Sequence, residues 1–106
     1  MARESAVDQF LTELPCLAEP YRARLQGINK TIRLEWGSHV AFIHLEDGSV
    51  RVTKSYDEYP SCIIHTKEGV LLGVIRGKTT PMEALLFGNV RVYGDVNLLL
   101  NLCSMQ

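Results

Sequence analysis

The sequence has little that would suit a nucleic-acid-binding or disulfide-bonded protein. Its 106 residues carry 11 basic and 12 acidic side chains, for a formal net charge of −1. The basic residues form no block that could neutralise a run of phosphates, which excludes nucleic acid as a partner. The three cysteines, Cys16, Cys62 and Cys103, are odd in number and too widely spaced for a C-x-x-C motif, which favours reduced, structural thiols.

Long hydrophobic runs are also missing. Charged residues interrupt the first twenty positions and exclude the apolar core of a signal peptide; they include Arg3, Glu4, Asp8 and Glu13. The hydrophobic tail is interrupted by Asn97 and Asn101 and is too short to span a bilayer. We therefore expect a cytoplasmic protein. A hydrophobic content of 46% is typical of a globular fold, and the length suits one domain over residues 1–106.

Signals for catalysis and metal binding are absent as well. The chain has no G-x-S-x-G motif and no Cys, His and acid set at a catalytic spacing. His39 and His44 lie an odd number of positions apart on one predicted strand, as do Cys62 and His65, so neither pair faces the same way. We expect no enzyme activity, no metal site and no cofactor.

The segment Gly77-Lys78-Thr79 has the last three residues of a phosphate-binding loop. It lacks the required glycine at the position of Leu72, and it follows a predicted helix instead of a strand. For Lys78 a solvated surface lysine is the simpler interpretation, and contact with a lipid head group or an anionic membrane is the alternative.

The sequence does contain an almost uncharged C-terminal quarter, in which only Arg91 and Asp95 carry charge after Ala84. Thr80 and Glu83 predict a capping box for a helix over residues 81–88. Residues 89–93 alternate as a strand, and Asp95 is placed to cap a final helix.

That final helix is hydrophobic around most of its circumference. Asn97, Asn101 and Ser104 form one narrow polar stripe, whereas a surface helix needs an apolar arc of only about 100°. The remaining apolar surface must contact a bound lipid, a second chain or other helices of the same domain.

Upstream, two turn signals predict an antiparallel meander of three strands. Gly37-Ser38 suits a type II′ hairpin and Asp47-Gly48 a type I′ hairpin. The two turns give one consistent register, which pairs Ile32 with Ile43, Leu34 with Ala41, Ile43 with Val52 and Leu45 with Val50. We expect that face, which also carries Trp36, to point inward. Val40 and Phe42, on the reverse face, would lie under the N-terminal helices or a partner subunit.

Short helices complete the predicted order of elements. Ser5 and Asp8 cap a first helix that Pro15 stops, and a second runs from Pro20 to Gly27 and buries Tyr21 and Leu25. Residues 61–65 form a fourth strand, after which Thr66 caps a helix over residues 67–76 that Gly77 closes. Gly69 and Gly73 weaken this helix by about 1 kcal/mol each. We interpret them as allowing close packing on the sheet; the alternative is an entrance to a cavity.

From about residue 60 to 102 the chain resembles the sterol carrier protein type 2 family of lipid-transfer domains. The resemblance is carried by an ordered set: Thr66, Gly77, Lys78, Pro81, Ala84, Phe87, Gly88, Val90, Val92, Gly94, Asp95, Leu98 and Leu102. It implies an α+β fold in which a five-stranded, mostly antiparallel sheet has helices packed on one face around an apolar tunnel. The Ser-Lys-Leu type of peroxisomal address that some relatives carry is not found at Gln106, and the N-terminal helix is short.

The resemblance also implies a function, namely non-catalytic binding and transfer or presentation of fatty acyl, sterol-like or isoprenoid lipids, with transient membrane contact. We assign the cavity wall to Trp36, Ile43, Ile64, Leu71, Ile75, Leu85, Phe87, Val92, Leu99, Leu102 and Cys103. From the sequence pattern alone these residues would be ordinary core. The alternative function is an accessory or dimerisation module whose C-terminal helix docks on a second copy or on an enzyme, for example in a lipid or quinone biosynthesis complex.

Overall fold

The computed structural model describes residues 5–54 and 59–103. Within these ranges the chain forms, in order, α1 (Ala6–Leu17), the 3₁₀ turn η1 (Glu19–Tyr21), α2 (Arg22–Leu25), β1 (Asn29–Trp36), β2 (His39–Glu46), β3 (Ser49–Thr53), β4 (Cys62–Thr66), α3 (Glu68–Ile75), α4 (Pro81–Leu86), β5 (Val90–Gly94) and α5 (Val96–Cys103). The order of elements is the one expected from the sequence.

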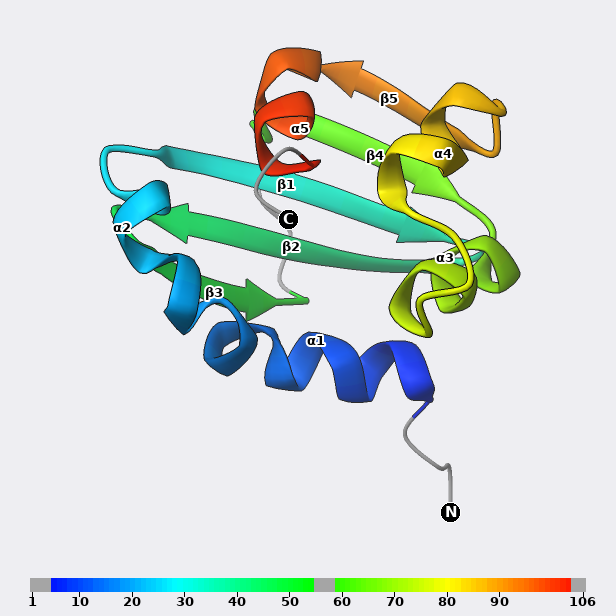
Figure 1. The fold of residues 1–106 in the computed structure, drawn as a ribbon, viewed down its shortest axis with the longest axis horizontal. Helices are drawn as coiled ribbons and strands as arrows, with labels where there is room; N and C mark the ends of the chain where they lie inside the picture. The colour runs from blue at the N-terminus through cyan, green and yellow to red at the C-terminus, as the bar shows by residue number, and fades with distance from the viewer. Residues whose placement is uncertain (1–4, 55–58, 104–106) are drawn as a thin grey trace.

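The strands form one mixed sheet with the order β3-β2-β1-β4-β5 (Figure 1). The pair β1 and β4 is parallel, and the other three neighbouring pairs are antiparallel. A parallel pair requires a crossover, because the chain must return to the same end of the sheet before it can pair again. The predicted fold class, a mostly antiparallel five-stranded α+β fold, is confirmed.

The predicted register of the meander is also confirmed. Ile32 pairs with Ile43 and Leu34 with Ala41 across β1 and β2. Across β2 and β3, Ile43 pairs with Val52 and Leu45 with Val50, as predicted. Asp47 and Gly48 have φ values of +48° and +96°, as a type I′ turn requires. The two-residue loops therefore fix which side chains share a face.

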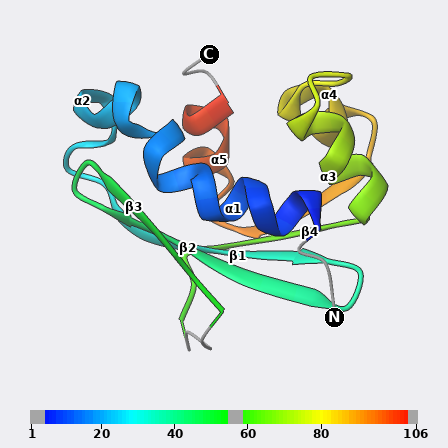
Figure 2. The same cartoon turned by 90° about the horizontal axis from the view of Figure 1, so that it is seen from below.

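All helices of the described residues cover the same face of the sheet, as the view in Figure 2 shows. Val7 and Leu11 of α1 pack on Leu34, Trp36 and Ala41 and form one core cluster. A second cluster joins α5 to the sheet through residues that are almost fully buried: Ile32, Leu45, Cys62 and Leu98. Because the helices of the described residues lie on the opposite face from Phe42, the expectation that Phe42 lies under the N-terminal helices is wrong. Phe42 is nevertheless only 2% exposed, and the Arg33 guanidinium lies 5.9 Å from its ring centre.

Three local predictions need correction. Pro15 does not stop α1, which continues to Leu17, and the Ala18 amide still donates to the Leu14 carbonyl at 2.9 Å. A proline near the end of a helix removes one internal hydrogen bond without preventing the next ones. Tyr21 is 41% exposed, although Leu25 is buried as expected. Thr66 does not cap α3: the N-cap is Lys67, and the Thr66 hydroxyl donates to the Asn89 carbonyl instead.

The interpretation of the two α3 glycines as close-packing sites is also wrong. A Cβ atom added at Gly69 would meet nothing within 4 Å, and one added at Gly73 would make an ordinary contact of 3.6 Å with Thr79. Neither position needs the absence of a side chain. The two glycines therefore weaken α3 without a compensating close approach.

Candidate functional site

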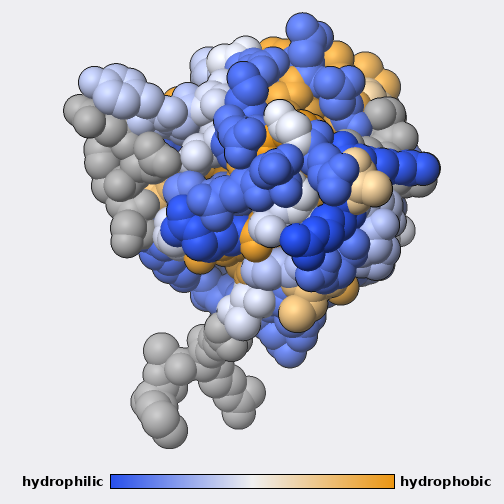
Figure 3. All heavy atoms as spheres, turned by 90° about the vertical axis from the view of Figure 1, so that its left-hand side faces the viewer, coloured by the Kyte–Doolittle hydropathy of each residue, from blue (hydrophilic) through white to orange (hydrophobic). Residues whose placement is uncertain are grey.

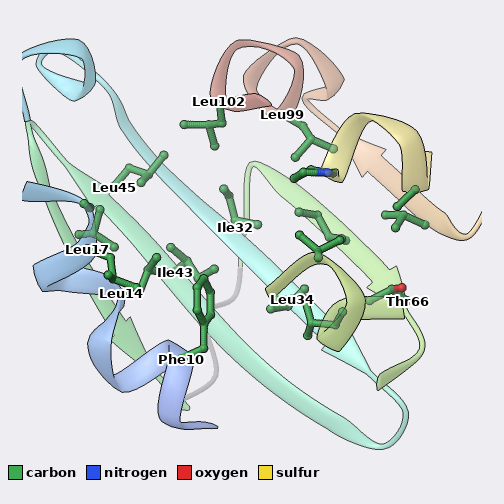
Figure 4. A pocket seen from close by; sticks show the side chains of 18 of the residues that line it. Phe10, Leu14, Leu17, Ile32, Leu34, Ile43, Leu45, Thr66, Leu99 and Leu102 are labelled. Atoms are coloured by element: carbon green, nitrogen blue, oxygen red, sulfur yellow. The ribbon is translucent and has the colours of Figure 1, made fainter. Parts of the chain in front are cut away.

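A cavity of about 480 Å³ lies between the helices and the inward face of the sheet. Its floor comes from all five strands, and its walls come from α1, η1, α2, α3, α4 and α5 (Figure 4). The described lining residues are Phe10, Leu14, Leu17, Ala18, Tyr21, Leu25, Ile32, Leu34, Ile43, Leu45, Val50, Ile64, Thr66, Val70, Leu71, Val74, Pro81, Ala84, Val90, Leu99 and Leu102. Ligand pockets in proteins typically measure about 300–1,000 Å³, so the size suits one small organic ligand.

The helices and strands place these side chains by simple periodicity. Alternation sends Ile32 and Leu34 of β1 and Ile43 and Leu45 of β2 to the same face. In α5 the Asp95 side chain accepts a hydrogen bond from the Leu98 amide at 3.1 Å, which fixes the start of the helix. With this start, Leu98 is buried in the core while Leu99 and Leu102 face the cavity.

The cavity offers almost no polar groups to a ligand. Among the described lining residues only Tyr21 and Thr66 have polar side-chain atoms, and none is charged. The Thr66 hydroxyl donates to the Asn89 carbonyl at 3.1 Å and points away from the centre of the cavity (Figure 4). A charge buried here would find no partner and would be strongly disfavoured. The site is therefore built for the apolar part of a molecule.

The opening of the cavity lies beside the C-terminal end of α1. Leu17 and Tyr21 line the cavity and are also 49% and 41% exposed, so they form part of its rim. Figure 4 places Leu17 and Leu14 on one side and Leu102 of α5 on the other. The phenol of Tyr21 gives this rim one polar group.

The structure brings together five of the eleven residues assigned to the wall from sequence: Ile43, Ile64, Leu71, Leu99 and Leu102 line the cavity. Trp36 is 1% exposed and belongs to the core under α1, where Ile75 also packs. Val92 packs on the second core cluster, and Leu85 is half-buried outside the cavity lining. Phe87 is 75% exposed and points to the surface. The side chain of Cys103 lies outside the described part of the structure.

Sequence reasoning missed the contribution of the N-terminal segment. Phe10, Leu14, Leu17, Ala18 and Tyr21 all line the cavity. The signal was present, because Phe10, Leu14 and Leu17 recur at helical spacing beside Val7 and Leu11. One helix thus carries two adjacent apolar stripes, one for the core and one for the cavity.

The described residues contain no group of His, Cys, Asp and Glu that could hold a metal ion. Burial raises the pKa of the Cys62 thiol, and the neighbouring Asp95 carboxylate adds to this effect. A thiol with a raised pKa carries little thiolate and is a poor nucleophile. None of the helices in the described ranges is long and apolar enough to cross a membrane.

Comparisons with solved structures show the same fold in several settings. Palmitated SCP2L2 from Aedes aegypti has a TM-score of 0.65 at 15% identity, covering 91% of this chain and 90% of that protein. The ubiquinone synthesis protein UbiJ-SCP2 has a TM-score of 0.60 at 24% identity, covering 95% of this chain and 82% of the other. The stereoselective inverting sec-alkylsulfatase Pisa1 from Pseudomonas sp. has a TM-score of 0.67 at 15% identity over 79% of this chain. That match spans only 14% of the sulfatase, so this chain corresponds to a small part of it.

No curated protein sequence matches this chain. The model of the SCP-2 sterol transfer family matches residues 8–105, which is nearly the whole chain. The match includes the α1 residues that line the cavity as well as the C-terminal segment. The chain therefore belongs to the SCP-2 sterol transfer family.

Proposed function

We propose that this protein is a cytoplasmic, non-catalytic carrier that binds the hydrocarbon part of a lipid in the cavity and transfers or presents it. The observation that carries the proposal is the cavity of about 480 Å³ with no charged residue in its described lining. Apolar surface gains about 25 cal/mol per Å² on leaving water, which gives an acyl or isoprenoid chain several kcal/mol. The palmitated relative of the same fold supports a fatty acyl chain as one ligand.

The polar end of the ligand would stay at the opening. Behind the rim, the described lining offers no free hydrogen-bond donor for a carboxylate, since the Thr66 proton is already donated to the Asn89 carbonyl. Leu17 and Tyr21 form the exposed rim where a head group can remain in water. Broad selectivity among single-chain and sterol-like lipids follows, because apolar contacts carry little directional information.

The experiment compares two adjacent leucines of α5. Leu99 faces the cavity, whereas Leu100 does not line it and is partly exposed. Leu99→Asp places an unpaired carboxylate in the cavity and should abolish lipid loading, because burying a charge without a partner is strongly unfavourable. Leu100→Asp introduces the same charge on the outside and should bind lipid as the wild type does.

Binding is measured by native mass spectrometry and by solvent extraction of the purified proteins, with circular dichroism to verify folding. A folded Leu99→Asp variant that keeps the lipid content of the wild type would refute the proposal. A wild-type protein that takes up neither palmitate nor a sterol would do the same.

A second candidate function is an accessory module that docks on another chain. It is supported by two apolar side chains on the outer side of α5, Val96 and Leu100, which are 41% and 37% exposed. UbiJ-SCP2, a ubiquinone synthesis protein, has a similar fold, and we propose a quinone-synthesis enzyme as one such partner. Molar mass by light scattering separates the two functions: a lipid-loaded monomer supports carriage, and an empty dimer supports docking.

A further inference from the structure

Among the described residues, the exposed basic side chains without an ion-pair partner all lie at one end of the molecule. Outside residues 67–91, every described lysine and arginine takes part in an interaction. Ion pairs are formed by Arg22, Lys30, Arg33, Arg51 and Lys54, and Arg24 also interacts with another group. Within the described residues, Lys67, Arg76, Lys78 and Arg91 are exposed and have no ion-pair partner. Unpaired cations of this kind remain available to an anionic surface.

This segment also carries an excess of positive charge. Residues 67–91 contain four basic and two acidic residues, whereas the rest of the chain contains seven basic and ten acidic ones. The two acids are Glu68 and Glu83, and the Glu83 carboxylate already accepts a hydrogen bond from the Thr80 hydroxyl. The molecule is thus polarised, with its positive end at α3 and α4.

The same end presents the most exposed pair of apolar neighbours in the described chain. Leu86 ends α4 and Phe87 follows it, and they are 76% and 75% exposed. Gly88, with φ of +75°, turns the chain directly after them into β5. Two such side chains at the tip of a turn contribute nothing to the core and cost solubility, so a partner surface is their natural role.

The fold holds the cations and the apolar tip side by side. The Thr66 hydroxyl bonds to the Asn89 carbonyl, which brings the start of α3 next to the α4–β5 turn. His65 pairs with Arg91 across β4 and β5, and α4 contacts both α3 and β5. Figures 1 and 2 both show α3, α4 and the start of β5 at one end of the molecule. Helix α4 also contributes Pro81 and Ala84 to the cavity wall.

We propose that this end, formed by Leu86 and Phe87 with Lys67, Arg76, Lys78 and Arg91, docks on the surface of an anionic lipid bilayer. Leu86 and Phe87 enter the boundary between head groups and acyl chains, and the four cations meet lipid phosphates. Docking through α4 brings one wall of the cavity to the membrane. The inference rests on the proposed function, since a lipid carrier has to meet the membranes between which it works.

The test is sedimentation of the protein with vesicles, either of pure phosphatidylcholine or of a three-to-one mixture of phosphatidylcholine and phosphatidylglycerol. The wild type should bind the mixed vesicles about tenfold more tightly, and added salt should remove this difference. Leu86→Gln/Phe87→Gln should weaken binding to the mixed vesicles by about tenfold. Arg76→Gln/Lys78→Gln should give a similar loss of about tenfold and a weaker salt dependence.

Matched controls change the same residue types elsewhere. Val96→Gln/Leu100→Gln removes two exposed apolar side chains of α5, and Arg22→Gln/Arg24→Gln removes two cations of α2; both should bind mixed vesicles as the wild type does. The proposed docking surface is refuted if the Leu86→Gln/Phe87→Gln variant binds mixed vesicles as tightly as the wild type. It is also refuted if the control variants lose as much vesicle binding as that variant does. It is also wrong if the wild type ignores vesicles and the pair Leu86 and Phe87 instead binds a protein.

Lipid uptake into the cavity is measured separately, without vesicles. Uptake that persists in the Leu86→Gln/Phe87→Gln variant while vesicle binding is lost supports the docking surface. Normal uptake by a wild type that ignores vesicles overturns the docking surface and leaves the carrier function intact. Vesicle binding without any uptake overturns the carrier function and leaves the docking surface standing.

Discussion

The ammonium nitrogen of Lys54, directly after β3, lies 2.6 Å from a carboxylate oxygen of Asp8 in the first turn of α1. The Ser5 hydroxyl donates to the other carboxylate oxygen at 3.0 Å. The hydrogen bond from Lys54, followed by that from Ser5, holds the pKa of Asp8 below its usual range. This ion pair ties the start of the cavity-lining helix to the edge of the sheet.

Asp8→Asn should lower the free energy of unfolding by about 0.5–1 kcal/mol at neutral pH, because the pair is partly exposed to solvent. A carboxyl group whose pKa is lowered by folding stabilises the protein above its unfolded-state pKa, and this contribution is lost as pH falls through the folded-state pKa. The unfolded-state value is near 3.8. Urea unfolding should therefore show the full difference between wild type and variant at about pH 7 and a smaller one at about pH 3. A difference of the same size at both pH values would contradict this account.

Gly94→Ala should destabilise the protein by about 2 kcal/mol or more, because it combines a strained backbone with a steric clash. Gly94 has φ of +94°, and a Cβ atom there would lie 2.5 Å from the Ser61 carbonyl oxygen. Gly69→Ala is the matched control, since a Cβ atom at that position meets nothing within 4 Å. It should leave stability unchanged or raise it by up to about 1 kcal/mol. Thermal unfolding of both variants measures the contrast, and equal melting temperatures would exclude it.

Trp36 is the single tryptophan of the chain and should report folding, with little response to ligand. It is 1% exposed, stacks on His39 with ring centres 5.5 Å apart, and does not line the cavity. Its emission should shift to longer wavelength on unfolding in urea. On titration of the native protein with palmitate the emission maximum should stay in place. A large shift at saturating palmitate would mean that the ligand reaches Trp36 and occupies a site other than the cavity described.

The meander of β1, β2 and β3 could be predicted almost completely from the sequence, because its determinants are local. Two-residue turns at Gly37-Ser38 and Asp47-Gly48 fix the pairing, and the alternation of side chains then fixes the faces. The end of α1 was predicted wrongly, because its determinants are not local. The effect of Pro15 depends on how many helical hydrogen bonds remain after it, and this is decided by the contacts of Leu14 and Leu17.

The cavity wall could be predicted only in part, because inward-facing residues belong either to the core or to the cavity. Trp36 and Leu34 share one face of β1, yet α1 covers Trp36 completely and leaves Leu34 beside the cavity. The difference is set by where the helices cross the sheet, which depends on tertiary packing that no periodicity encodes. Phe87 illustrates the same limit, since its pattern resembles core while the turn at Gly88 directs it outward.

Pro15 also divides α1 into two parts of unequal firmness. It has no amide hydrogen to donate to the Leu11 carbonyl, so one backbone hydrogen bond is missing between the first and the last turns of the helix. Val7 and Leu11 before this point are sealed in the core, whereas Leu17 beyond it borders open solvent. Local unfolding starts where buried contacts and backbone hydrogen bonds are fewest. The last turn of α1 should therefore be the first part of the cavity wall to unfold locally.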